Sequence, residues 1–147
     1  DVAHLQESAI QDVLGLCTRP LVSSHGACAS IYPHWRNISD ETVRGIGQTG
    51  GVLGVFFIRQ WLGPGWSATL DDWAKHVERV GEVAGPQAMA IGTDFDGTPM
   101  MPKGLKDVTD FPRLAEALLR RGLGKDVVRG ALGDNAIRFM RQALPGS

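Results

Sequence analysis

The feature that most constrains this chain is an alternation of short apolar runs with longer segments of helical periodicity. Three runs, at residues 20–24, 51–58 and 88–93, lack the strict apolar–polar alternation of a half-exposed strand. Continuous apolar runs are typical of strands in a parallel sheet that is buried on both faces. Asp1-Val2-Ala3 resembles the end of a fourth strand. We therefore predict parallel strands separated by helices, the first helix covering residues 5–16.

Start and stop signals delimit the other predicted helices. Ser39 is a candidate N-cap, and Thr69-Leu70-Asp71-Asp72 has the pattern of a capping box with Asp in place of Glu. Gly85-Pro86 is expected to end the helix that Thr69 begins. Asp110 is predicted to cap a further helix, and residues 125–143 are predicted to form the last one.

Such an alternation produces either a doubly wound sheet or part of a (β/α)8 barrel. The 147 residues fit one ordinary domain, whereas a complete barrel takes about 250 residues. In both architectures the functional residues collect at the carboxyl ends of the strands. The residues that follow each predicted strand are therefore the first candidates for a site.

Composition argues against several functional classes. With 15 basic and 16 acidic side chains, the net charge is −1, so no excess of cations is available to bind nucleic acid. No apolar run approaches the roughly 20 residues that span a bilayer. No signal peptide opens the chain, which would favour a cytoplasmic location if the source were bacterial. Cys17 and Cys28 are expected to be free thiols.

Two histidines and an aspartate follow predicted strands. His4 follows the strand stub, His25 ends the next strand, and Asp94 ends the last. Neighbouring strands lie about 4.8 Å apart, so imidazoles at matching heights can converge on one ion at about 2.1 Å. The alternative is that each histidine is simply hydrogen-bonded. We expect Asp96 to cap the following turn while Asp94 points towards the site.

Other polar residues allow a functional and a structural interpretation. Arg36, in the loop beyond His25, could bind a substrate carboxylate bidentately or could be an ordinary surface arginine. His76 lies within a predicted helix, where a packing or solvated role is expected, and His34 is expected to be a loop residue.

Seven stretches, in order along the chain, match the pattern of a known family. They are Asp1-Val2-Ala3-His4, Val22-Ser23-Ser24-His25, His34-Trp35-Arg36-Asn37, Thr69-Leu70-Asp71-Asp72, Gly92-Thr93-Asp94-Phe95-Asp96-Gly97, Gly104-Leu105-Lys106-Asp107-Val108 and Ala131-Leu132-Gly133-Asp134-Asn135. Together they resemble the zinc-dependent membrane (renal) dipeptidases, peptidase family M19 of the amidohydrolase superfamily. Each motif is weak alone, but the ordered set is specific.

The resemblance implies a metallodipeptidase that hydrolyses the peptide bond of dipeptides with a zinc-activated hydroxide. It implies that His4 and His25 bind one zinc of a two-zinc centre and that Arg36 holds the C-terminal carboxylate of the dipeptide. Asp94 would exchange protons with the metal-bridging hydroxide and the leaving amine. Trp61 is similar to an aromatic of the family's pocket wall, although a packing role explains it equally well.

The chain also departs from the family pattern. Trp35 stands where the family usually has proline, and Gly26 where serine is common. Both positions lie near the proposed pocket, so they concern the substrate preference and not the chemistry. The family's H-x-D pair, its bridging glutamate and its oxyanion-polarising histidine are absent. The resemblance implies an α/β fold, the C-terminal half of a (β/α)8 TIM barrel of the metallo-dependent hydrolase type.

Residues 1–147 are accordingly expected to be a single segment, from the end of strand 5 to strand 8 plus the terminal helices. We expect the N-terminal half of the barrel to lie outside this segment and to be its partner, without which the segment should be a poor catalyst. Because a half-barrel exposes sheet edges, a homodimer is a further candidate assembly.

Two alternatives belong to other classes. Asp94-Phe95-Asp96-Gly97-Thr98 also fits the D-x-D-G-T motif of haloacid-dehalogenase-like phosphatases, in which the first Asp is the nucleophile and the second the acid/base. That motif belongs on the first strand of its domain, and it leaves His4, His25 and Arg36 unexplained. The other alternative is a non-catalytic barrel fragment, which requires nothing of these residues.

Overall fold

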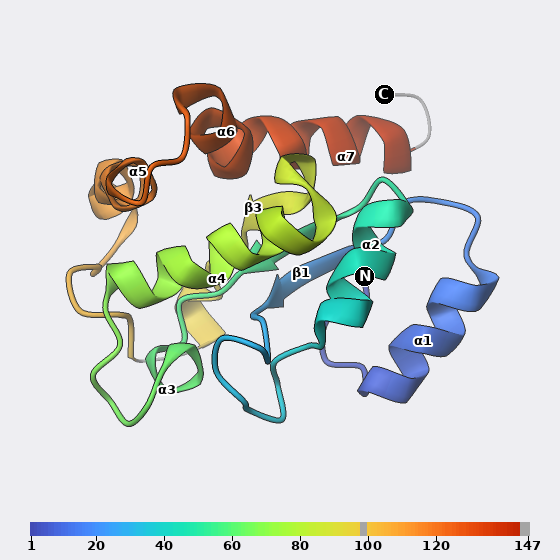
Figure 1. The fold of residues 1–147 in the computed structure, drawn as a ribbon, viewed down its shortest axis with the longest axis horizontal. Helices are drawn as coiled ribbons and strands as arrows, with labels where there is room; N and C mark the ends of the chain where they lie inside the picture. The colour runs from blue at the N-terminus through green and yellow to red at the C-terminus, as the bar shows by residue number, and fades with distance from the viewer. Residues whose placement is uncertain (98–99, 145–147) are drawn as a thin grey trace.

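The computed structural model describes residues 1–97 and 100–144 and contains a parallel sheet of three strands in the order β1-β2-β3 (Figure 1). The strands are β1 (Val22–Gly26), β2 (Val52–Val55) and β3 (Met89–Ile91). All three predicted strands are present, with shifted ends. The predicted run 51–58 is longer than β2 because Phe56 and Phe57 leave the regular ladder, although their amides still donate to backbone oxygens of the flanking segments.

The predicted fourth strand at Asp1–Ala3 is wrong for this structure, since these residues form no strand. Val2 N donates one backbone hydrogen bond to Val22 O at 2.8 Å. The Asp1 carboxylate accepts from the amides of Ala3 and Ser24. Residues 1–3 therefore lie beside β1. Because the Ser24 amide donates to the Asp1 side chain and not to a backbone oxygen of this segment, no regular ladder forms.

Helices α1 (Glu7–Leu16), α2 (Asp40–Gln48) and α4 (Leu70–Ala84) follow the predicted pattern. In Figure 1, α2 and α4 lie over one face of the sheet, with α1 outside α2. Ser39 caps α2 by accepting from the Thr42 amide, as predicted. The capping box of α4 is also confirmed, because Thr69 and Asp72 each accept from the other's backbone N–H.

Eight further helices and helical turns occur in the described residues. They are α3 (Arg59–Leu62), η1 (Pro86–Ala88), η2 (Phe95–Gly97), η3 (Val108–Asp110), α5 (Phe111–Arg120), α6 (Lys125–Arg129), η4 (Gly130–Asp134) and α7 (Asn135–Ala143). Asp110 stands at the N-cap of α5, but its side chain accepts from the Lys106 amide instead of an α5 amide. The predicted capping bond is therefore not formed.

The single helix predicted over residues 125–143 is wrong, because η4 is a π-helical turn in which Gly133 leaves the helical conformation. The turn is followed directly by Asn135, whose buried amide donates to Pro86 O and Met89 O, both at 2.8 Å. These bonds tie the last helices to the start of β3. The helical periodicity of residues 125–143 does not predict these long-range hydrogen bonds.

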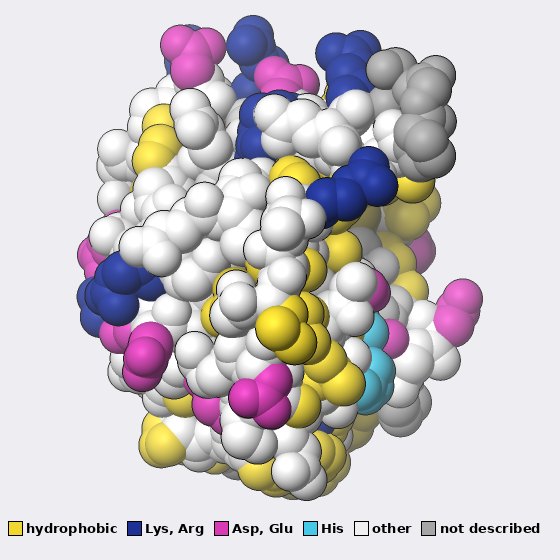
Figure 2. Space-filling view, turned by 90° about the vertical axis from the view of Figure 1, so that its right-hand side faces the viewer, with side chains coloured by type: hydrophobic (Ala, Val, Ile, Leu, Met, Phe, Trp, Pro, Cys, Tyr) yellow, Lys and Arg dark blue, Asp and Glu magenta, His cyan; other side chains and the backbone are white. Residues whose placement is uncertain are grey.

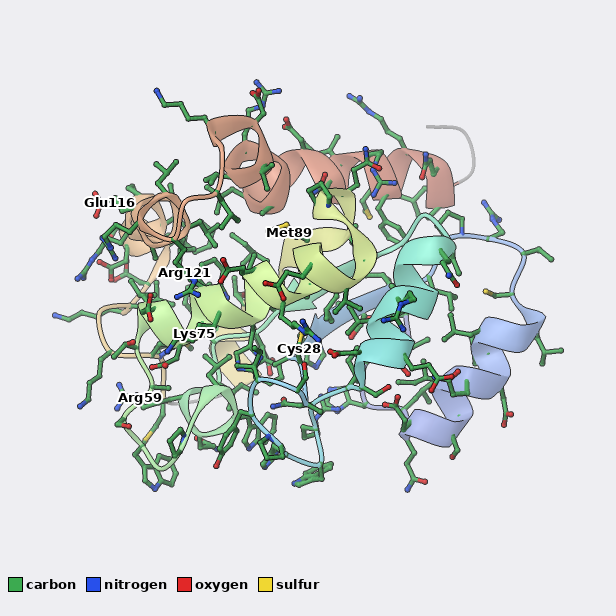
Figure 3. The ribbon with its side chains drawn as sticks, in the orientation of Figure 1. Cys28, Arg59, Lys75, Met89, Glu116 and Arg121 are labelled. Carbon is green, nitrogen blue, oxygen red and sulfur yellow. The ribbon has the colours of Figure 1, made fainter. Side chains whose placement is uncertain are left out.

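The core lies between the sheet and its helices. Leu53, Val55 and Met89 join Trp73 and Val80 of α4 in one large buried cluster, and Figure 3 shows Met89 behind α4. Successive residues of a strand point to opposite faces. Val52 and Ala90 accordingly lie in a second, small cluster with Phe139 of α7. None of the described helices is both long and apolar enough to cross a bilayer.

Candidate active site

The two histidines predicted as metal ligands meet in space. His25 lies in β1 and His4 in the turn before α1, and their Nε2 atoms are 2.7 Å apart. The Nδ1 atom of His25 lies 3.0 Å from the hydroxyl of Ser24, which fixes the orientation of that ring. On the face seen in Figure 2, histidine reaches the surface beside a band of apolar side chains.

Backbone strain coincides with the predicted site. Among the described residues other than glycine, His4 (φ 70°) and Asp94 (φ 52°) are the two with positive φ. This left-handed conformation is unfavourable for residues that carry a Cβ, and strained residues of this kind cluster at functional sites. Sequence reasoning did not use this signal. It singles out one of the two predicted metal ligands, His4, and the predicted proton-transfer residue, Asp94, but not His25.

Asp94 follows β3, at the same end of the sheet as His25. Gly97 N donates to Asp94 O and closes the turn η2. A Cβ at Gly97 would lie 2.1 Å from an Asp94 carboxylate oxygen. Glycine at position 97 therefore leaves the space in which the carboxylate lies.

Electrostatics link these residues with Arg36. Burial lowers the pKa of His25, the negative charge of Asp94 opposes that effect, and His4 and Arg36 lower the pKa further. Charges act on His25 in this way only when they are near. The structure therefore brings His4, His25, Asp94 and Arg36 into one neighbourhood, although 90 residues of sequence separate the first from Asp94.

Arg36 is not an ordinary surface arginine. The residue is 9% exposed, and its guanidinium carbon lies 5.8 Å from the ring centre of Trp35 and 5.6 Å from that of Trp61. Within residues 1–97 and 100–144, its buried Nη2 atom has no hydrogen-bond partner. Leaving a buried N–H donor of a charged group unpaired is unfavourable, so this environment suits an anion that accepts from Nη2.

Three residues that sequence reasoning did not assign hold the loop around Arg36. Asn37 donates from its amide to Tyr32 O and Trp61 O. Cys28 and Ile38 form an isolated bridge that closes the base of the loop. Side-chain amides that bond to two backbone oxygens organise loops, but no sequence pattern identifies their partners.

His76 is fully buried, in agreement with the packing interpretation. Its Nδ1 accepts from Cys28 N at 3.0 Å, and its Nε2 lies 3.1 Å from Leu62 O. Figure 3 places Cys28 in the loop after β1, close to α4. Cys17 and Cys28 are free thiols, as predicted, and burial raises the pKa of Cys28 to about 12, which makes it unreactive.

The other predicted residues divide between packing and loops. His34 lies in a loop, as expected, and its ring stacks on Trp61 at 5.1 Å. Trp61 packs against Phe56 and the core, in agreement with the packing interpretation, and its ring centre lies 5.6 Å from the Arg36 guanidinium carbon. Its role in a pocket wall stays a prediction. Asp96 is exposed in η2. The motif residue Thr98 lies outside the described residues, and the capping role of Asp96 stays a prediction.

His4 and His25 supply two of the ligands that a zinc ion needs. Two imidazole nitrogens on one tetrahedral zinc lie roughly 3.3 Å apart, so the 2.7 Å separation of the His4 and His25 nitrogens would have to open slightly. No cluster of three or more His, Cys, Asp or Glu side chains able to hold a metal occurs in the described part of the chain. This segment thus offers two converging nitrogen donors, and a complete site needs more.

Comparison with known proteins supports the same family. The membrane dipeptidase (peptidase family M19) model matches residues 1–145. The dipeptidase verJ of Clonostachys rogersoniana is 36% identical over 140 residues, which are 95% of this chain and 36% of that protein.

Two solved structures share the fold. An amidohydrolase from Pseudomonas aeruginosa is 30% identical with a TM-score of 0.86, over 95% of this chain and 50% of that one. A metallopeptidase from Rhodobacter sphaeroides, liganded with a phosphinate mimic of the dipeptide L-Ala-D-Ala, is 26% identical with a TM-score of 0.91. The match covers 98% of this chain and 42% of that one.

This chain therefore spans half or less of the length of these relatives. Its three parallel strands and covering helices are a partial barrel of their type. The phosphatase alternative finds no support, because Asp94 follows the last described strand and the family match covers nearly the whole chain. The chain belongs to the membrane dipeptidase family, peptidase family M19.

Proposed function

We propose that this segment forms part of the active site of a zinc-dependent dipeptidase. The observation that carries the proposal is the convergence of His4 and His25, with Nε2 atoms 2.7 Å apart, at the strand ends where Asp94 also lies. The relatives named above include a dipeptidase and a metallopeptidase holding a dipeptide mimic. The substrate would be a dipeptide, and the reaction hydrolysis of its peptide bond.

His4 and His25 would hold one zinc ion, with the Ser24 hydroxyl orienting the ring of His25. When bound, zinc would act as a Lewis acid and lower the pKa of a water towards about 7. Asp94, beside His25, would accept a proton at its carboxylate from the attacking water. The same carboxyl group would then give a proton to the leaving amine nitrogen.

Arg36 would bind the C-terminal carboxylate of the dipeptide. The support is its burial, its unpartnered Nη2 and the absence of a paired carboxylate among the described residues. A bidentate pair with this guanidinium would place the scissile bond at a set distance from the metal. This positioning would restrict the substrate to peptides with a free carboxylate at that point.

The remaining ligands of a two-zinc centre would come from the other half of the barrel. Residues 1–147 would correspond to the region from the end of strand 5 to the terminal helices, and this segment alone would be a weak catalyst. A homodimer is a further expected assembly, because the sheet of a half-barrel has open edges.

The test uses the full-length protein. We expect stoichiometric zinc by elemental analysis and hydrolysis of L-Ala-L-Ala and L-Ala-D-Ala but not of p-nitrophenyl phosphate. His25→Ala should lose bound zinc, whereas the matched variant His34→Ala, outside the ligand pair, should retain it. Full-length protein that carries no divalent metal and cleaves no dipeptide would identify a non-catalytic member of the family.

A further inference from the structure

Trp35 is a large apolar side chain that the fold leaves uncovered. It is 82% exposed, although the neighbouring Arg36 is 9% exposed. Exposed tryptophans are costly to keep in water because burial of an indole removes a large apolar area. Beside the buried Arg36, the exposed face of Trp35 is therefore an apolar surface that a bound ligand can cover.

Trp35 belongs to an aromatic group around the Arg36 guanidinium. The rings of Trp35 and Trp61 are 6.1 Å apart at 59°, and His34 lies 5.7 Å from the first and 5.1 Å from the second. The amide of Arg36 donates to Nδ1 of His34 at 3.2 Å. The orientation of Trp35 at this position is therefore set by ring contacts and by the local backbone.

The carboxylate bound by Arg36 would lie beside this ring. A carboxylate carbon paired with a guanidinium lies about 4 Å from its central carbon, and the Cα of the same residue is one bond further. The Trp35 ring centre is 5.8 Å from the Arg36 guanidinium carbon. A side chain on that Cα can therefore reach the exposed indole.

From this geometry, and resting on the proposed dipeptidase function, we propose that Trp35 lines the subsite for the side chain of the C-terminal residue. The subsite favours dipeptides whose C-terminal residue is aromatic or large and apolar. Trp61 forms the inner wall, since it is partly buried against the core. Trp35 forms the outer wall, since it is exposed beside Arg36.

The experiment measures kcat/KM of the full-length, metal-loaded protein for L-Ala-L-Phe and for L-Ala-Gly, together with the D-Phe counterpart of the first. In wild type, kcat/KM for the better of the two Phe dipeptides should exceed kcat/KM for L-Ala-Gly. In Trp35→Ala the ratio of the two should fall about tenfold, equivalent to about 1.4 kcal/mol. Trp35→Phe should retain most of the preference, because it keeps an aromatic face.

Trp66→Ala is the matched control, since Trp66 is also exposed, at 58%, but lies in the segment before α4. It should leave the ratio unchanged. Binding of phosphinate analogues with a C-terminal Phe or Gly, measured by calorimetry, should show the same change in ratio without turnover.

The outcomes separate this inference from the proposed function. Hydrolysis of both dipeptides with an unaltered ratio in Trp35→Ala would overturn the subsite and leave the dipeptidase intact. An equal loss for Phe and Gly substrates would also overturn it, because Trp35 would then only orient Arg36. Failure of wild type to cleave any dipeptide would instead refute the function itself.

Discussion

The backbone amide of Cys28 donates a 3.0 Å hydrogen bond to Nδ1 of the fully buried His76. Because Nδ1 accepts, the proton of the neutral ring is on Nε2, which donates to Leu62 O. One imidazole on α4 thus joins the loop that carries Arg36 to the helix that carries Trp61. The charged ring would place a second proton against the Cys28 amide.

Stability should therefore fall as the solution becomes acidic. Burial lowers the pKa of His76 from 6.5 to about 4, so the unfolded chain takes up a proton in this range while the folded chain does not. The free energy of unfolding should decrease between pH 6.5 and pH 4, by up to about 3 kcal/mol from this residue.

Urea unfolding of wild type and His76→Gln at pH 7.5 and pH 5 measures this contribution. Because the variant lacks His76, its free energy of unfolding should depend less steeply on pH than that of wild type. Some dependence should remain, since His25 and His34, which the variant keeps, also have lowered pKa values. Equal slopes in the two proteins would show that His76 does not cause the acid sensitivity.

Gly97→Ala should impair the site more than the fold. The new Cβ would lie 2.1 Å from an oxygen of the Asp94 carboxylate, and that flexible side-chain end can turn away at little cost in stability. We expect kcat to fall by about tenfold or more with a change in unfolding free energy under about 1 kcal/mol.

Gly63→Ala is the control for Gly97→Ala, because the nearest atom to its new Cβ is 3.8 Å away. Its kcat should match wild type. A Gly97→Ala protein with normal kcat and unaltered stability would contradict the position assigned to the carboxylate.

Asp94→Asn should separate metal binding from proton transfer. The amide keeps the shape of the carboxylate but cannot accept the proton, so we expect a loss of about 10²- to 10⁴-fold in kcat with bound zinc retained. Elemental analysis and steady-state kinetics on the same preparation measure both. Asp96→Asn, which changes the neighbouring exposed acid, should remain active, and full activity of Asp94→Asn would refute the proton-transfer role.

Local signals explain what could be predicted from the sequence. The Ser39 cap and the Thr69–Asp72 capping box act within four residues, so their residue types specify them. Continuous apolar runs predict the strands, and the position of polar residues directly after those runs predicts the site candidates. Helical periodicity does not predict the break at Gly133, and the residue type of Asn135 does not identify its hydrogen-bond partners, Pro86 O and Met89 O, which lie more than 40 residues earlier in the chain.

By itself, the sequence determined the alternation of strands and helices, the end of the sheet at which chemistry collects, and the family. Only the tertiary structure decided that His4 and His25 point their Nε2 atoms at each other, that the buried Nη2 of Arg36 has no hydrogen-bond partner among the described residues and that Trp35 is exposed beside it. Residue type and spacing set local conformation, whereas distance, burial and charge environment arise when segments far apart in the chain pack together.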